Sequence, residues 1–239
     1  YYTDSKVPGA PPMTNIGSIE IVSSGNTLNQ REVFVYWQQI PIQINNGENF
    51  TYYVELEHYP EITPVEKTNA YAKYTNLSIG ESYTFNIWSQ NSVGRSEEKS
   101  VVYVPRQSDR IDEPLSFTKI AFGDGHYELS WEAPTKLFYT GPVKHYTIFW
   151  CTHDRDRPYQ CTGHLSWVEI PSDKKMYNIT VSDVTTNQFA ISANNDVSSS
   201  GMVWAACTVI HNQAMGKMKK IQVNQVGSTV IQVSWKLEC

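Results

Sequence analysis

Two cysteines and two histidines near the middle of the chain are the residues whose types and spacing could do chemistry. Cys151 and His153 are separated by one residue, and Cys161 and His164 by two. Thiolate and imidazole are the usual protein ligands of structural zinc, so this spacing is compatible with a zinc site. The same two cysteines could instead form a disulfide across a hairpin. The surrounding sequence, WCTHDRDRPYQCTGHLSW, leaves both interpretations open at this point.

The other polar residues form no catalytic constellation. The chain has no glycine-rich phosphate loop, no HExxH pair and no GxSxG elbow. Its six histidines are scattered, and its carboxylate pairs at 97–98 and 112–113 fall in an expected turn and an expected linker. We therefore expect no enzyme activity and no cofactor.

Charge and hydropathy narrow the classes of partner. The 239 residues carry a formal net charge of −5, with no basic stripe that could neutralise phosphates, so we expect no nucleic acid partner. No window of about 18 apolar residues exists, so membrane attachment would need a segment outside this sequence. Aromatic residues make up 13% and charged residues only 18%, which favours a packed, β-rich fold over disorder.

The stretch from Leu77 to Ser96 indicates the kind of fold in which the cysteines and histidines are placed. Its apolar and small residues recur at every second position, which predicts a strand with one buried face. Tyr83 follows Leu77 by six residues, which is typical of a chain crossing between two sheets with its tyrosine hydroxyl bonded back to the backbone. Asn91 to Gly94 predicts a turn. Seven short strands of this kind fit within about 100 residues, as in a β-sandwich.

The same pattern recurs along the chain. Trp37, Trp131 and Trp235 each end an alternating strand, and they lie roughly 100 residues apart, the size of one sandwich module. The run from Phe189 to Asn195 repeats the run from Phe85 to Asn91. We therefore predict the tail of a preceding module and a linker at 1–12, a first module at 13–105, a linker at 106–114, a second module at 115–211 and a truncated third module at 212–239.

These residues resemble the fibronectin type III family. The resemblance implies an all-β fold of tandem seven-stranded, immunoglobulin-like sandwiches, and it rests on the second-strand tryptophan, the Tyr-x-Val/Ile pattern of the third strand and the corner tyrosine with its following turn. The second copy departs from the pattern. Asn187 stands where the corner tyrosine should be, and Ser198 stands where the turn glycine should be. We expect a looser crossing between the sheets there.

The cysteine-closed insertion, flanked by Trp150 and Trp167, resembles the membrane-proximal modules of tall class I cytokine receptors. The resemblance implies the extracellular stalk of a single-pass plasma-membrane receptor of the JAK/STAT type. Its partners would be proteins, either a receptor chain or a cytokine complex. The Trp-Ser-x-Trp-Ser box of the ligand-binding head is absent. The alternative is a fibronectin type III array of a cell-adhesion molecule or a receptor tyrosine phosphatase.

In a secreted module, the disulfide is favoured over zinc for Cys151 and Cys161. Closing so short a loop would stabilise the module by roughly 3 kcal/mol in the chain-entropy model. Of the other cysteines, Cys207 is expected to be a buried thiol and Cys239 to pair with a residue outside this sequence.

Two further features are candidates for modification or contact. Sequons begin at Asn49, Asn76 and Asn178, and a secreted context makes them glycosylation candidates. An apolar loop is a candidate protein contact, with packing between modules as the alternative. This loop contains Leu137, Phe138 and Tyr139.

Overall fold

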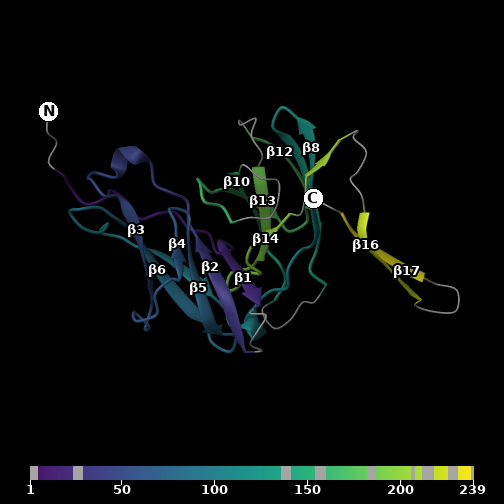
Figure 1. The fold of residues 1–239 in the computed structure, drawn as a ribbon, viewed down its shortest axis with the longest axis horizontal. Coiled ribbons are helices and arrows are strands. Elements are labelled where there is room, and N and C mark those ends of the chain that lie inside the picture. Colours follow the sequence, from purple (N-terminus) through teal and green to yellow (C-terminus); the bar gives the residue numbers. More distant parts are fainter. Residues whose placement is uncertain are drawn as a thin grey trace.

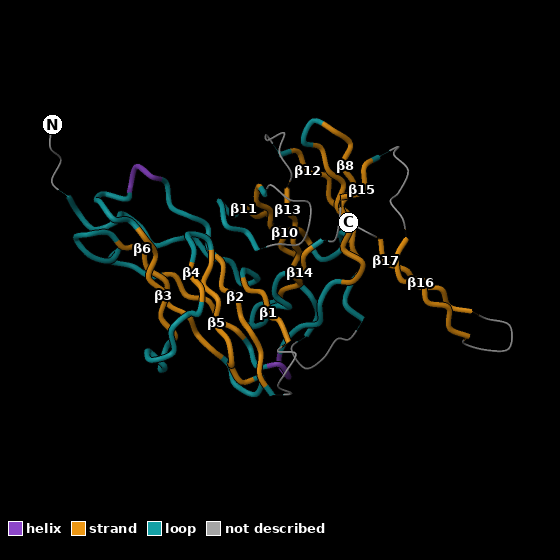
Figure 2. The backbone as a smooth tube through the Cα atoms, viewed as in Figure 1, coloured by secondary structure: helices purple, strands orange, loops and turns teal. Residues whose placement is uncertain are grey.

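Two β-sandwiches lie beside each other and are followed by a β-hairpin (Figure 1, Figure 2). The computed structural model describes residues 5–23, 29–135, 141–153, 160–181, 187–205, 208–211, 218–225 and 231–237. In these residues the regular structure is β-strand, apart from two short 3-10 helices, η1 (Ile42–Ile44) and η2 (Gln107–Asp109). The predicted all-β fold of tandem sandwiches is confirmed.

The first module has seven strands in two sheets. One sheet has the order β1-β2-β5-β4 and the other the order β3-β6-β7. The strands are β1 (Ile19–Ser23), β2 (Gln30–Tyr36), β3 (Thr51–Leu56), β4 (Glu66–Lys67), β5 (Tyr71–Ser78), β6 (Tyr83–Gln90) and β7 (Ser100–Val104).

The second module repeats this plan with eight strands and two differences in pairing, one of which is the parallel pairing of its last strand, β15, with β8. Its sheets have the orders β12-β9-β8-β15 and β11-β10-β13-β14. The short strand β4 of the first module pairs with β5, whereas β11 of the second pairs with β10 in the opposite sheet. The strands are β8 (Leu115–Gly123), β9 (His126–Glu132), β10 (His145–Thr152), β11 (Ser166–Pro171), β12 (Met176–Thr180), β13 (Asn187–Asn194), β14 (Val203–Trp204) and β15 (Thr208–Ile210). A hairpin of β16 (Met218–Gln225) and β17 (Ile231–Leu237) follows.

The core of the first module follows the predicted alternation. In β3, Tyr52, Val54 and Leu56 are buried and the residues between them are partly exposed. The corner that was expected between the sheets is present, because the backbone N–H of Ser78 donates to the hydroxyl of Tyr83 at 2.9 Å. This bond fixes the position at which the chain enters β6.

The turn after β6 is closed by an asparagine side chain, and the second module uses the same device. Asn91 Oδ1 accepts from the backbone N–H of Val93 and Gly94. Asn195 Oδ1 accepts in the same way from residue 197 and from Ser198, at 3.0 and 2.9 Å. The asparagine therefore supports the turn whether its fourth residue is glycine or serine.

The crossing into β13 replaces the corner tyrosine by a different contact. Asn187 is buried, and its backbone carbonyl accepts a hydrogen bond at 3.1 Å from the ammonium of Lys119, which is also buried. Residues 182–186, on which the expected looseness of this crossing depends, lie outside the described residues.

Strand β13 is buried along its whole length, on both faces. One face holds Phe189, Ile191 and Ala193 in the core of the second module. The other face carries Gln188, Ala190 and Ser192, which are also buried. A strand of an isolated sandwich would expose one face to water. The first module covers that face here.

Candidate functional site at the joint between the modules

The cysteine pair forms a disulfide. Cys151 and Cys161 are bonded, with their Cα atoms 5.9 Å apart. Neither sulfur is then a thiolate that could bind zinc. Among the described residues, no group of three or more His, Cys, Asp or Glu side chains could hold a metal ion. His164 instead approaches the first module, with its Nε2 atom 3.4 Å from Nε2 of Gln38.

The disulfide lies in an apolar cluster built by both modules, which we call the joint core. Both cysteines are almost completely shielded from water. Side chains of β2 and β5 in the first module meet side chains of β10, β13 and the cysteine-closed insertion in the second. The joint core consists of Phe34, Tyr36, Ala70, Tyr71, Phe149, Cys151, Cys161, Leu165, Ala190 and Met202.

Aromatic rings lie close together in the joint core. The ring of Tyr71 lies 5.6 Å from that of Phe34 and 5.5 Å from that of Tyr36. Trp204 of β14 packs across the joint, with its ring 6.1 Å from that of Tyr36. Aromatic pairs at such distances stabilise a contact beyond the area they bury. These side chains therefore hold the modules together as a core holds a domain.

Two glycines let the backbones of the modules approach each other. The N–H of Met202 donates to the carbonyl of Ile19 at 2.6 Å, a main-chain bond between the modules. Gly201 has a φ of 72°, and a Cβ there would lie 2.8 Å from the Ile19 oxygen. A Cβ at Gly17 would lie 2.0 Å from Oγ of Ser192. Any larger residue at either glycine would collide with the other module.

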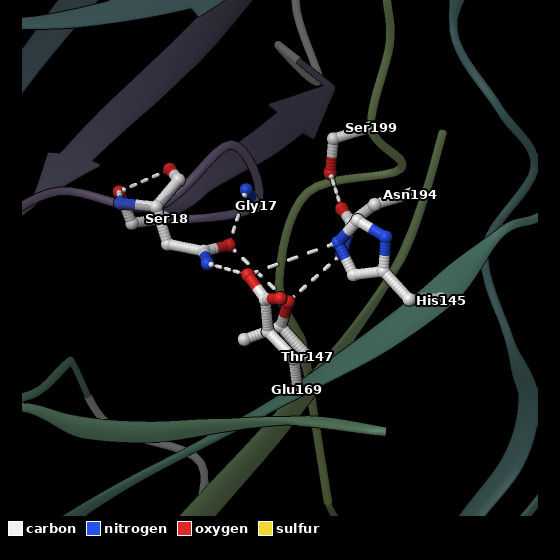
Figure 3. Close-up of polar contacts among 8 residues, drawn as sticks. Gly17, Ser18, His145, Thr147, Glu169, Asn194 and Ser199 are labelled. Carbon is white, nitrogen blue, oxygen red and sulfur yellow. Dashed lines mark hydrogen bonds and ion pairs between the residues drawn. The ribbon is translucent and has the colours of Figure 1, made fainter. Parts of the chain in front are cut away.

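A polar network continues the joint at the edge of the joint core (Figure 3). Asn15 of the first module donates to Glu169 at 3.1 Å, and its Oδ1 atom accepts from Thr147 at 3.2 Å. Asn194 then donates to Thr147 at 2.9 Å and accepts from Ser199 at 2.6 Å. The buried ends of β10 and β13 are therefore bonded to the segment that precedes β1.

The carboxyl group of Glu20 is half-buried at the edge of the joint core. The hydroxyl of Tyr36 donates to Glu20 Oε2 at 2.7 Å. Burial raises the pKa of Glu20 above its ordinary value, and the hydrogen bond from Tyr36 and the charge of Lys73 offset this only in part. The pKa of Tyr36 is itself raised well above its ordinary value, first by burial and then by the nearby Glu20 carboxylate.

The linker between the modules is docked against the second module. Arg110 Nε donates to the carbonyl of Ser200 at 2.8 Å, and the hydroxyl of Ser198 donates to the carbonyl of Asp109 at 2.7 Å. Ile111 belongs to the core of the second module. The connection is therefore held along its length and does not act as a free hinge.

The sequon asparagines are not part of the joint core. The three sequon asparagines are exposed, and two of them, Asn49 and Asn76, have positive φ angles of 54° and 59°. The candidate contact loop at 137–139, Cys207 and Cys239 lie outside the described residues. No helix in the described part of the chain is long and apolar enough to cross a membrane.

Sequence reasoning missed the joint, although β2 carries a signal for it. The run from Val33 to Trp37 is apolar at every position. Its odd positions lie in the core of the first module, and Phe34 and Tyr36 lie in the joint core. A run of this kind indicates a strand that is covered on both faces.

Comparison with known proteins gives one clear similarity in sequence. No protein-family model matches the chain. The chain is 25% identical over 238 residues to a "Cytokine receptor" of Drosophila melanogaster, covering 95% of this chain and 18% of that protein. The chain thus spans less than a fifth of the length of this relative.

Solved structures similar to the chain contain fibronectin type III domains. The FN1–FN3 domains of chicken CNTN1 match with 15% identity and a TM-score of 0.32, over 86% of this chain and 69% of that chain. A two-domain fibronectin type III segment of chicken tenascin matches with 14% identity and a TM-score of 0.32, over 82% of this chain and 98% of that chain.

Proposed function

We propose that the chain is part of the extracellular stalk of a single-pass cytokine receptor, in which two modules joined at a fixed angle position receptor chains for signalling. The similarity to the Drosophila cytokine receptor over 95% of the chain supports the receptor class. Within that class, the FWCTHDRDRPYQC insertion favours the class I, JAK/STAT type and most resembles the invertebrate receptor Domeless. Its partners are then proteins, and the chain itself carries no catalysis.

The joint core is the observation that carries the stalk role. Modules of one chain usually move relative to each other unless a large, apolar interface holds them. Here buried aromatic rings, a main-chain bond and a docked linker connect the two modules. In a joint of this kind, the orientation of one module determines that of the next. A stalk needs this property if it is to set the distance between the membrane-proximal ends of two receptor chains.

The cysteine-closed insertion supports the same role. An insertion that recognises a ligand would present its side chains to solvent. The disulfide of this insertion instead lies in one buried apolar cluster with Phe34, Tyr36 and Tyr71 of the first module. The described part of the insertion therefore supports the joint, as expected of a stalk.

Binding and signalling measurements test the proposal separately. The 239-residue chain, secreted and immobilised, is expected not to bind the cytokine that its receptor recognises. In the full receptor, Gly17→Ala is expected to leave surface expression and cytokine binding unchanged and to reduce the response of a STAT reporter. Gly80→Ala is the matched control, since the nearest atom to its added Cβ is Ser78 Oγ at an ordinary 3.6 Å.

Two results would overturn the stalk role. One is tight cytokine binding by the isolated chain. The other is a STAT response in the Gly17→Ala receptor equal to that of the Gly80→Ala receptor. If the full protein mediates cell aggregation and does not affect a STAT reporter, the adhesion-array alternative is favoured.

A further inference from the structure

We infer that Glu20 makes the joint between the modules sensitive to pH, so that uptake of a proton by its carboxyl on acidification holds the two modules together more tightly. Glu20 lies on β1, opposite Phe34 of β2. Its neighbour Ile19 points into the core of the first module, so Glu20 points to the other face of the sheet, where the joint core lies.

Groups from both modules surround the carboxyl. Tyr36 of the first module donates to it at 2.7 Å. The indole of Trp204 and the side-chain amide of Gln160, both in the second module, also face it. The indole Nε1 of Trp204 is buried and has no hydrogen-bond partner in the described residues. Glu20 is therefore partly shielded by the second module while the joint is closed, and opening the joint exposes it further to water.

The charged groups that the structure describes near Glu20 do not neutralise it. Lys73 of β5 is a nearby cation, but its ammonium is paired with Glu32 at 2.9 Å and lies 5.2 Å over the ring of Phe34. Glu66, on the short strand beyond, accepts from the hydroxyl of Tyr71 at 2.5 Å and adds negative charge. Among the described residues of the second module, the groups that face Glu20 are Trp204 and Gln160, which are neutral. Within the described part of the chain, an ionised Glu20 is thus poorly compensated in the closed joint.

The direction of the effect follows from proton linkage. The closed joint raises the pKa of Glu20, mainly by burial, above the ordinary value of 4.5 that the carboxyl has when it is exposed. The closed state therefore binds the proton more tightly than the open state. Closing becomes more favourable as the pH falls through the raised pKa, and the gain levels off below the ordinary value. One proton can change the open-to-closed ratio by at most about tenfold per pH unit.

Two other titratable sites in the joint need controls. His145 Nε2 lies 4.0 Å from Glu169 Oε1 at the polar edge, and His164 contacts Gln38. His145→Asn and His164→Asn remove these groups one at a time. Glu32→Gln removes a carboxylate that shares Lys73 but is partly exposed. All three variants are expected to keep the pH dependence.

The experiment measures joint opening in the 239-residue chain between pH 7.5 and pH 5. Gly17→Ala provides a background in which the open state is populated, and one spin label on the exposed surface of each module reports the distance between them. The open fraction is expected to fall with pH in this background. Glu20→Gln, which retains a side-chain oxygen that can accept from Tyr36, is expected to abolish the change. If the Gly17→Ala chain stays closed, deuterium exchange of the β13 amides, corrected for the intrinsic effect of pH on exchange, measures the same equilibrium.

The inference is overturned if the pH dependence is unchanged by Glu20→Gln, or if the joint opens on acidification. It rests on the joint that the proposed stalk role uses, but the two can fail separately. Cytokine binding by the isolated chain would refute the stalk role and leave the pH response of the joint intact.

Discussion

Substitution of Gly17 by alanine tests whether the contact between the modules is specific. The added Cβ would lie 2.0 Å from Oγ and 2.7 Å from Cβ of Ser192, and 3.0 Å from Oδ1 of Asn194. Both partners are fully buried in β13, so neither can swing into solvent. Overpacking of this kind costs about 1–3 kcal/mol. Because the clash exists only while the joint is closed, the closed-to-open ratio should fall by about 5–150-fold.

Inter-module distances in the 239-residue chain provide the assay. Gly17→Ala should broaden the distance distribution between spin labels on the two modules and increase the radius of gyration in solution scattering. Gly80→Ala should leave both unchanged. Because Gly17 lies outside the core of the first module, the hydrogen-exchange protection of β6 should also stay the same.

A second substitution, in β13, tests whether the clash with Ser192 causes the opening. Ser192→Gly removes both atoms that collide with the new Cβ, and the Ser192 hydroxyl has no hydrogen-bond partner that would be lost. Glycine in a strand costs roughly 0.5–1 kcal/mol by itself. The double variant should nevertheless be more closed than Gly17→Ala alone, as a double-mutant cycle would show. Absence of rescue, or a normal joint in Gly17→Ala, would refute the proposed packing.

Three other predictions concern the individual modules. Replacing Cys151 and Cys161 together by serine should destabilise the second module by roughly 3 kcal/mol, seen as a lower denaturant midpoint of its own transition, and an unchanged midpoint would contradict this. Tyr83→Phe removes the corner hydrogen bond to Ser78 and should cost the first module about 1 kcal/mol in chemical unfolding, whereas Tyr59→Phe, at an exposed ring, should cost less than about 0.5 kcal/mol. Changing each exposed sequon asparagine to glutamine should remove one glycan from chain secreted from animal cells, seen as a higher electrophoretic mobility. A site whose substitution leaves the mobility unchanged carries no glycan.

The local parts of the fold could be predicted because they depend on side-chain spacing within one strand. Alternation in β3 and the Leu77–Tyr83 spacing each follow from short-range geometry, and the structure contains the strand and the corner they imply. The cysteine pairing required a choice between zinc and a disulfide, and the bond is present.

The joint could not be predicted in the same way, because it brings together strands far apart in the sequence. The alternation of apolar residues along a strand explains the burial of only one face of β2 and of β13. The residues on the second face, such as Phe34 and Ala190, have a partner only after both sandwiches have formed. Apolar residues at consecutive positions of a strand indicate that a second surface covers it, but they do not identify that surface.

Burial of the disulfide imposes an order of assembly. Once the joint is closed, Cys151 and Cys161 are shielded from the oxidants and isomerases that form disulfides. Oxidation of the second module must therefore precede its docking onto the first. During synthesis the first module leaves the ribosome before the second. The aromatic face of β2 is therefore exposed until the second module docks onto it. The proposed stalk role requires synthesis in the secretory pathway, and on that proposal a chaperone there that binds exposed aromatic residues should associate with the chain in this interval and dissociate after the disulfide has formed.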